Sequence, residues 1–511
     1  MRSLRHLGVL VLWASLLSAC SEKLPSTTRD VSLESYRSFG DSRMSVNSHR
    51  IRAVIDSMIR NDQDGLTADF RARSYYLQES DFLWIHRYGV TSQADTLLRY
   101  LQTIGQMGFS PHRFSVPQIS DDIRRVRQLD FDDKHSVNLV LGRLEYLLTK
   151  SYLRYSAGQR FGYMNPNYIF NRVDTIKSNR PDTIQRPVRF RGLFDIAMEH
   201  ADSKFFELAF RKVAHDSVPS FLCEIQPPSD FYHSLAKEYA DGNGSKEWRV
   251  KVFCNMERAR WRLADYPQQH HRYVFVNIPS FHLFAVDNND TISMRIGCGS
   301  YETKTPLLTS AIKRMDVNPR WIVPRSIVEN DMIHYFSRSY CERRGFFVMD
   351  RKTGKEVPMN QVHRGLLQDK NYAVVQRGGV GNSLGRLIFR FDNNFSVYLH
   401  DTSSRDVFSR QDRGVSHGCV RVEKPFELAK FILKGKNSEI IDDLYYNMTA
   451  DSLTEKKRII SSIKVEPQMP VYLSYYTIYP MKGKCRKGWE EYPDVYGYDK
   501  VIYNFLISNY R

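Results

Sequence analysis

The chain has 511 residues, of which 42% are hydrophobic and 26% charged, proportions that are typical of folded proteins and exclude a mainly disordered chain. Because single hydrophobic cores stop growing at roughly 250 to 300 residues, we expect two or three domains. Lys and Arg outnumber Asp and Glu by 74 to 57, and the formal net charge of +17 favours polyanionic surroundings, but no zinc-finger spacing, DNA-reading basic helix or ribonucleoprotein motif supports a nucleic-acid partner.

The first 20 residues are typical of a targeting segment. Arg2 and Arg5 give it a positive start, and the apolar stretch from Leu7 to Leu17 is too short to span a bilayer stably. The segment ends in Leu17-Ser18-Ala19-Cys20, which resembles the lipobox of bacterial lipoproteins, whose cysteine sulfur takes a diacylglycerol. The alternative is an ordinary cleaved signal peptide that carries a cysteine by chance.

A lipid on Cys20 would determine where the protein resides. The mature chain would begin at Cys20 and be held at a membrane surface by acyl chains, with the polar stretch 21–41 as a tether. We therefore expect the protein in the cell envelope, on the periplasmic side, anchored to the inner or the outer membrane. The sequence is compatible with either membrane.

Between residues 42 and 250 the apolar residues recur at helical spacing. The stripe from Ala94 to Ile104 predicts a helix that is stopped by Gly108, and the stripe from Leu141 to Tyr152 predicts a second, longer helix that ends near Gly158. Both stripes are typical of core packing and not of ligand sites. We interpret residues 42–250 as a helical scaffold domain.

The periodicity changes to that of strands after Trp261, with Asp287 to Asp290 as a hairpin turn. The predicted strands are 273–278, 282–286, 292–296, 387–391 and 395–399. We therefore expect residues 251–511 to form a β-rich domain and the whole chain to have an α+β fold.

Three segments of this second domain depart from the strand pattern. Residues 329–370 are highly charged and have weak periodicity, which is equally typical of a lid over a site and of a solvated surface excursion. A short helix is predicted at 426–433, with Pro425 at its first turn. The C-terminal extension 443–511 is aromatic-rich and is expected to pack back onto the domain.

A histidine and a cysteine lie close together in the chain after the last predicted strand. That strand ends at His400, and the run Ser416-His417-Gly418-Cys419 follows shortly. A free thiol is only partly ionised at neutral pH, so a nucleophilic cysteine needs a nearby imidazole or helix N-terminus, and both His400 and His417 are candidates. The amides of Gly418 and Cys419 can point at one oxygen, as an oxyanion hole requires. Either residue type alone is more often structural, whereas the combination favours catalysis.

The other cysteines do not form a recognisable framework. Five remain besides Cys20 and Cys419, which is too few for a disulfide-rich scaffold in a chain of this length, and no CxxC pair indicates a structural zinc site. They are Cys223, Cys254, Cys298, Cys341 and Cys485. In an oxidising compartment Cys419 must avoid these partners in order to act as a free thiol.

The motif around Cys419 resembles that of a known family. A histidine followed after a short gap by Ser or Thr and then His-Gly-Cys is the motif of the L,D-transpeptidase (YkuD-type) catalytic domain, and the span from Val374 to Val422 is similar to it, in particular to its large periplasmic subgroup. Further matching residues are Gln376, Gly379, Asn382, Leu384-Gly385, Tyr398 to Thr402, Asn255 to Trp261, Asn277 to Pro279 and Asn318 to Pro324. The similarity extends over roughly residues 250–511.

The resemblance implies roles for individual residues. Cys419 would be the nucleophile and His400 the general base. The supporting residues would be Asp401, whose carbonyl orients the imidazole, Ser416, His417 and Gly418, which shape the oxyanion site, and Arg421, which braces the loop or meets a substrate carboxylate. No metal or other cofactor is implied.

The implied reaction is transfer of an acyl group between stem peptides of peptidoglycan. Cys419 would attack the third residue of a tetrapeptide stem, release the terminal D-alanine and form a thioester, which the amine of an acceptor stem would resolve into a 3→3 cross-link. Carbapenem-type inhibitors would acylate the same thiol. The alternatives are an L,D-carboxypeptidase, in which water resolves the thioester, and a non-catalytic, lipid-anchored scaffold that binds the wall.

The sequence departs from the subgroup at a few positions. Gly378 stands where proline is frequent, and Ser383 stands where alanine is usual. No separate peptidoglycan-binding repeat is present in the sequence, so the resemblance assigns no surface for docking the glycan strand.

Overall fold

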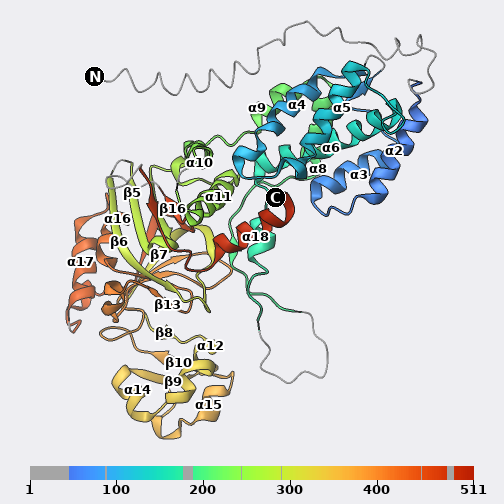
Figure 1. The fold of residues 1–511 in the computed structure, drawn as a ribbon. Helices are drawn as coiled ribbons and strands as arrows, with labels where there is room; N and C mark the ends of the chain where they lie inside the picture. The colour runs from blue at the N-terminus through green and yellow to red at the C-terminus, as the bar shows by residue number, and fades with distance from the viewer. Residues whose placement is uncertain are drawn as a thin grey trace, which may run out of the picture. The chain divides into compact units, whose positions relative to one another are not determined.

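The chain divides into two units, each assembled from separate stretches of sequence (Figure 1). This computed structural model describes residues 45–86, 89–176, 188–242, 244–288, 290–450, 452–479 and 488–511. Of these, the first unit holds the residues up to Asn165, Glu199–Arg262 and Asp499–Arg511, and the second holds Pro166–Met198 and Leu263–Tyr498. The predicted targeting segment 1–20, the tether 21–41, Cys20 and Cys485 lie outside the described residues.

The predicted domain boundary at residues 250/251 is wrong. It falls inside helix α11 (Lys246–Arg260), whose second half from Val252 onward is almost completely buried in the helical unit. The prediction also missed that Pro166–Met198 belongs to the β-rich unit, to which strand β3 (Phe194–Asp195) connects it by pairing with β7 (Leu307–Val317). The buried half of this helix includes the polar residues Asn255, Glu257, Arg258 and Arg260, so no apolar stripe revealed its unit.

The first unit is helical and is organised around one long helix, α6 (Val137–Phe161), which is buried along most of its length. Its other α-helices are α2 (Ser48–Asn61), α3 (Thr67–Leu77), α4 (Ser92–Gln102), α5 (Val116–Gln128), α8 (Ser203–Ala214), α9 (Val218–Glu224), α10 (Asp230–Ala240), α11 and nearly all of α18 (Tyr498–Tyr510). Of these, α2, α3 and α5 pack against α6. The described helices are too short or too polar to cross a bilayer.

Both helices predicted in this unit are confirmed, with different ends. Helix α4 stops at Gln102, and a short 3₁₀ turn, Ile104–Met107, leads to Gly108 in the left-handed conformation. Helix α6 continues past Gly158 to Phe161. Gly158 lies within the helix and allows close packing there, since a Cβ would lie only 2.1 Å from the ring of Tyr163.

The second unit is built on a sheet that closes on itself. The strands are β4 (Arg272–Asn277), β5 (His282–Asp287), β6 (Asp290–Gly299), β7, β11 (Leu387–Phe391), β12 (Leu399–His400), β14 (Val420–Val422) and β15 (Ser462–Ser474). They lie in the order β11-β12-β14-β6-β5-β4-β15-β7, and β7 also pairs with β11. Side chains such as those of Val276, Leu283 and Phe389 are completely buried in its core. The chain is therefore α+β, as predicted.

Most predicted strands are confirmed, but residues 395–399 do not form one. Strand β12 consists of Leu399 and His400 only. The preceding residues follow a turn in which the Asn393 side chain accepts hydrogen bonds from the amides of Phe395 and Val397 and donates one to the Val397 carbonyl. Asparagine side chains that bond the nearby backbone in this way compete with the sheet ladder.

The C-terminal extension is divided between the two units: strand β15 is part of the sheet, but Asp499–Arg511 belongs to the helical unit, so the prediction that the whole extension packs onto the β-rich domain is wrong. Strand β15 lies between β4, to which it is parallel, and β7, to which it is antiparallel. Before it come helix α16 (Pro425–Ile432), which confirms the predicted helix, and α17 (Ser438–Thr449). After it, Tyr475, Tyr496 and Tyr498 pack their rings together.

Residues 321–376 form a subdomain of their own, although the weak periodicity of 329–370 predicted no clear elements there. Strands β8 (Trp321–Ile322), β10 (Tyr372–Gln376) and β9 (Phe346–Asp350) make a small antiparallel sheet, with helices α12 (Arg325–Ile327), α13 (Ile333–Tyr335), α14 (Arg338–Arg344) and α15 (Arg364–Gln368) and a π-helical turn, Val328–Met332. Their apolar residues meet through non-local pairing, which leaves no local periodicity to detect.

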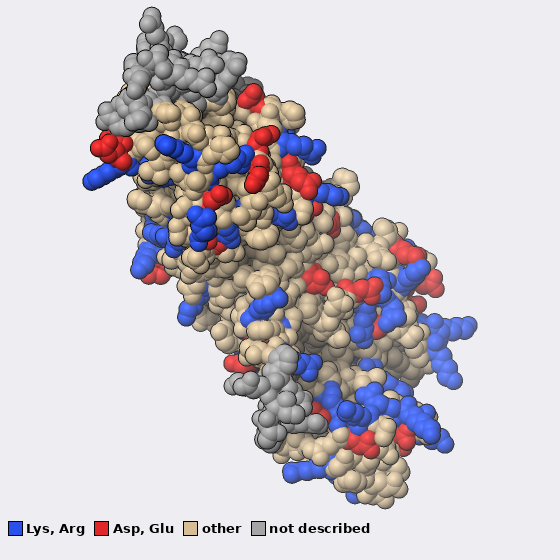
Figure 2. Space-filling view, turned by 90° about the vertical axis from the view of Figure 1, so that its right-hand side faces the viewer, with Lys and Arg blue, Asp and Glu red and all other residues tan. Residues whose placement is uncertain are grey.

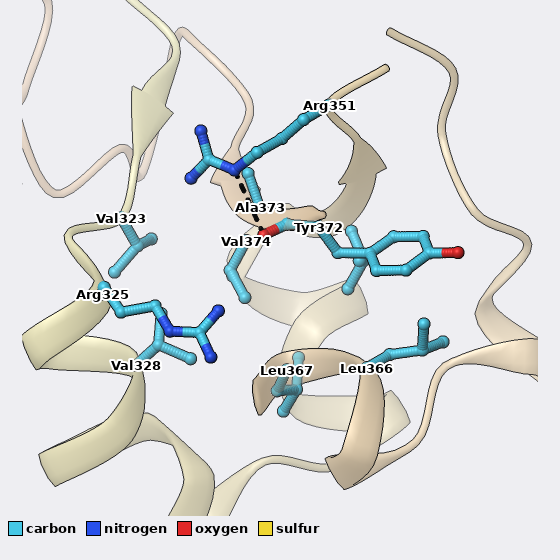
Figure 3. Close-up of a pocket in the computed structure, with 10 residues that line it drawn as sticks. Val323, Arg325, Val328, Arg351, Leu366, Leu367, Tyr372, Ala373 and Val374 are labelled. Carbon is cyan, nitrogen blue, oxygen red and sulfur yellow. Dashed lines mark hydrogen bonds between the residues drawn. The ribbon is translucent and has the colours of Figure 1, made fainter. Parts of the chain in front are cut away.

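The core of this subdomain is nearly filled (Figure 3). Val323, Val328, Leu367 and Val374 are buried together, and the Arg351 Nε donates a hydrogen bond of 3.4 Å to the Tyr372 carbonyl. The remaining cavity of about 10 Å³ has room for about one water molecule, so it is not a substrate site. Lys and Arg side chains gather at the lower end of the view in Figure 2, where this subdomain lies.

Candidate active site

The parallel pairing of β12 with β14 brings the candidate residues together. Leu399 pairs with Val420 and His400 with Arg421, while the Val420 N–H donates a 3.0 Å hydrogen bond to the Tyr398 carbonyl. Register partners share a face, and successive residues alternate between faces. Leu399 and Val420, both fully buried, therefore point into the core. On the other face lie His400 with Arg421 and, one step back, Tyr398 with Cys419.

His400 is held as a buried, neutral imidazole. Its side chain is almost fully buried, and its Nδ1 is hydrogen-bonded to the Asp401 carbonyl. Because a carbonyl only accepts, this bond requires the proton on Nδ1 and leaves the Nε2 lone pair free. Burial lowers the His400 pKa to about 4, helped by the positive charges of Arg421 and Arg390 and opposed by the carbonyls of Asp401 and Leu384.

Cys419 is a partly buried thiol with no disulfide. Burial raises its pKa to about 11, although the amide and hydroxyl of Tyr398 and the charges of Arg390 and Arg421 act in the opposite direction. Within the described part of the chain, no hydrogen bond joins this thiol to His400. The two groups are thus both neutral at pH 7, and the base must remove the proton as the thiol reacts.

The loop before Cys419 is braced from within by Ser416. Its Oγ donates to the Cys419 carbonyl at 2.6 Å and accepts from the Gly418 N–H at 3.1 Å. Gly418 has a φ of 120°, which disfavours any other residue. Because its N–H is already bonded to Ser416, the Gly418 amide is not available for an oxyanion here. The Cys419 N–H makes no hydrogen bond with the described residues and is the free donor of the two.

Two threonines brace the same loop from outside. The Thr303 hydroxyl donates to the Ser416 carbonyl at 2.7 Å, and the Thr305 hydroxyl donates to the Gly418 carbonyl at 2.8 Å while accepting from Gly299 N at 2.9 Å. Both lie between β6 and β7, and β6 pairs with β13 (Gly414–Ser416). Sequence reasoning missed them because more than one hundred residues separate them from the loop.

His417 faces the subdomain. Its ring is about half exposed, and its Nε2 lies 3.0 Å from the Oδ2 of Asp331 in the π-helical turn. Of the two histidines that the sequence offered as bases, only His400 lies on the face that carries Cys419. His417 instead links the cysteine loop to residues 329–370.

Two residues next to the pair were not found from the sequence. The ring of Tyr398 lies edge-on to His400, with centroids 5.7 Å apart. The guanidinium of Arg390, held by Asp316 at 2.8 Å, covers the same ring at 4.6 Å. Tyr398 could have been found from its spacing of two residues before His400, since that spacing returns to the same face of a strand.

Arg421 and Asp401 differ in whether the polar atoms of their side chains have hydrogen-bond partners. The Nε of Arg421 is buried without a hydrogen-bond partner among the described residues, which is costly unless a ligand supplies one. The Asp401 carboxylate accepts from the Arg386 N–H at 2.9 Å and from Arg405 at 3.1 Å. A Cβ on Gly385 would come within 2.4 Å of it, so glycine is needed there.

Comparisons with known proteins fit this arrangement. Residues 271–441, which contain these site residues, match the family model of the L,D-transpeptidase catalytic domain (YkuD), and residues 70–238 match that of a scaffold domain. A Haemophilus influenzae protein, provisionally named an L,D-transpeptidase, is 28% identical over 263 residues, which is 50% of each chain. The chain thus spans half the length of this relative.

Among solved structures, an L,D-transpeptidase from Mycobacterium smegmatis matches 40% of this chain and 58% of its own, with 13% identity and a TM-score of 0.17. The match to the family model and to the Haemophilus influenzae relative supports the L,D-transpeptidase catalytic-domain family for residues 271–441.

Proposed function

We propose that the protein is a cysteine-dependent L,D-transpeptidase that forms 3→3 cross-links in peptidoglycan. The single observation that carries this proposal is the register of β12 and β14, in which His400 and Cys419 are diagonal neighbours on one face. A neutral imidazole with a free Nε2 is the form that a general base requires.

The first step acylates the thiol. The Cys419 sulfur attacks the carbonyl of the third stem residue while its proton passes to the His400 Nε2. The sulfur–carbon bond forms, the bond to the terminal D-alanine breaks, and the imidazolium returns the proton to the departing amine. The Cys419 N–H is the backbone donor that remains free to bind the developing oxyanion.

The second step transfers the acyl group. The amine of an acceptor stem gives its proton to His400 and attacks the thioester carbonyl, so that an amide forms, the carbon–sulfur bond breaks and the Cys419 thiolate takes the proton back from His400. Arg421, with its buried unpaired Nε opposite His400, is suited to a carboxylate of a stem. Ser416, Gly418 and Asp401 act as positioning residues, because their bonds hold the loops that carry the pair.

The subdomain of residues 321–376 is proposed to be a lid over this site. His417 is adjacent to Gly418 and contacts Asp331 of the subdomain. A movement of the subdomain is therefore transmitted to the loop that carries Cys419. We also keep the proposal that Cys20 carries the lipid anchor and that the protein works on the periplasmic side of the inner or outer membrane.

The direct test is intact-mass analysis after incubation with a carbapenem. A single adduct is expected on the wild type and on Cys298→Ala, a control at a buried cysteine, and none on Cys419→Ala. No adduct on the wild type, or one that persists in Cys419→Ala, would refute the mechanism. Muropeptides from purified sacculi then distinguish the outcomes: cross-linked dimers support transpeptidation, tripeptides alone indicate an L,D-carboxypeptidase, and binding without turnover indicates a scaffold.

A further inference from the structure

A cleft of about 670 Å³ lies beside the candidate site, at the carboxyl ends of β12 and β14. The residues that follow β12, Asp401 to Arg405, form one wall, and those that follow β14, Glu423 to Glu427, form another. The loop 379–386 and the end of helix α17 complete it. Its volume is in the range of ligand pockets in proteins, roughly 300 to 1,000 Å³.

Most of the charged side chains that line the cleft are held by the protein. Arg386 donates to the carbonyls of Asn447 and Ala450, and Arg405 donates to Asp401 and to the Glu423 carbonyl. The carboxylate of Glu423 is paired with Arg295 and that of Glu427 with Lys430, whereas the exposed Lys424 has no ion pair among the described residues. An uncharged ligand would leave these interactions in place.

The remaining surface is aromatic and apolar, with small hydroxyls. Tyr445 is 55% exposed and its ring lies 5.3 Å from that of Phe426, while Val380 on the loop opposite is 72% exposed. The side chains of Ser403 and Thr449 also line the cleft. An exposed aromatic face beside hydroxyl groups suits a ligand that has both an apolar face and hydroxyls, as a pyranose ring does.

The distance from the cleft to the thiol fits a stem peptide. Glu423 follows Cys419 by four residues through strand β14, a span of about 13 Å at roughly 3.3 Å per residue. Three extended stem residues cover about 10 Å, and the linker to the sugar adds to that. A sugar seated in the cleft can therefore present the third residue of its stem to Cys419.

We propose that this cleft binds the glycan backbone of a peptidoglycan strand, as an uncharged chain of N-acetylated amino sugars. The proposal rests on the function proposed above, because it is the stem that connects the cleft to Cys419. It supplies the docking surface for the glycan that the sequence left unassigned.

The test is calorimetric titration of the full chain with short chains of N-acetylglucosamine, which carry neither stems nor charge, using Cys419→Ala as parent so that no turnover occurs. The parent is expected to bind. Adding Tyr445→Ala should weaken binding at least tenfold, and so should adding Val380→Glu from the opposite wall, whose exposed side chain is not needed for folding. Tyr168→Ala, a control tyrosine that is 56% exposed elsewhere in the same unit, should leave binding unchanged.

Several outcomes would overturn the proposal. They are no binding by the parent, binding by Tyr445→Ala and Val380→Glu that equals that of the parent, and sugar-free tetrapeptide binding that Tyr445→Ala abolishes. Carbapenem acylation of the wild type is scored separately. An adduct without glycan binding refutes the cleft alone, whereas glycan binding without an adduct refutes the catalytic proposal and keeps the cleft as a glycan site.

Discussion

His400 and Arg421 are register partners on the parallel strands β12 and β14, so a buried imidazole lies directly beside a guanidinium. Burial and this positive charge both disfavour the imidazolium, which is why the pKa of His400 falls to about 4. The pairing therefore keeps a base deprotonated in conditions where an exposed histidine would be partly charged.

The acid limit of acylation follows from this pKa. Lowering the pH through about 4 protonates His400 and prevents it from accepting the thiol proton, so the carbapenem acylation rate should stay constant from neutral pH down to that point. Arg421→Gln removes one of the opposing charges, and its acid limit should move up toward 6.5, whatever the rate at the plateau. A wild-type limit at 6.5 or above would contradict the prediction.

The thiol should be slow to react with an unspecific alkylating agent at neutral pH. Because burial raises the Cys419 pKa to about 11, its iodoacetamide alkylation, followed by peptide mass mapping, should increase steeply with pH and become half-maximal near that value. Tyr398→Phe removes a hydroxyl that lowers this pKa, so the curve should move further up. The exposed Cys223 serves as an internal control, and half-maximal reaction of Cys419 near neutrality would rule out a buried neutral thiol.

Removal of the Thr305 hydroxyl should destabilise the cysteine loop. Thr305→Val keeps the shape but leaves the Gly418 carbonyl and the Gly299 N–H unpaired in a fully buried place, which costs about 2 kcal/mol in the free energy of unfolding. Thr303→Val should cost less, because the Ser416 carbonyl still accepts a hydrogen bond from the Ser300 N–H. Urea unfolding gives both values, and equal stability of the two variants would argue against this bracing.

Alanine substitutions at Gly385 and Gly379 should separate the cost of backbone strain from the cost of a steric clash. Both have positive φ, but a Cβ on Gly385 would lie 2.3 Å from Asp401, while nothing lies within 4 Å of one on Gly379. Gly379→Ala should cost about 1 kcal/mol in unfolding free energy, and Gly385→Ala more than about 3 kcal/mol. A similar loss for both variants would mean that the Asp401 loop readily moves aside.

The contact between His417 and Asp331 should hold the subdomain of residues 321–376 only weakly. Both side chains are about half exposed, so Asp331→Asn should change the unfolding free energy by no more than about 0.5 kcal/mol. It should nevertheless speed hydrogen exchange in residues 328–332 and at His417. Glu329→Gln, which alters a neighbouring pair with Arg325, is the matched control and should leave exchange at His417 unchanged.

Much of the fold was accessible from the sequence because it is locally periodic. Strand β5 alternates between more and less buried residues, β4 and β11 are mostly continuous apolar runs, and helix α4 has a continuous apolar stripe. The failures have local causes as well. Asn393 replaces ladder bonds before β12, and the subdomain builds its core from short elements that carry no stripe of their own.

For the site, the sequence by itself determined the residue types: a cysteine between Gly418 and Val420, a histidine upstream, and their resemblance to a transpeptidase motif. Only the tertiary structure decided which groups meet. The register of two parallel strands brings Tyr398 beside Cys419 and Arg421 beside His400. Thr305 binds the loop before Cys419 although more than one hundred residues separate them in the chain. His417 contacts Asp331 and not Cys419. The physical reason is that a sheet register and a buried hydrogen bond join residues that are distant in the chain, whereas periodicity reports only each segment's own burial.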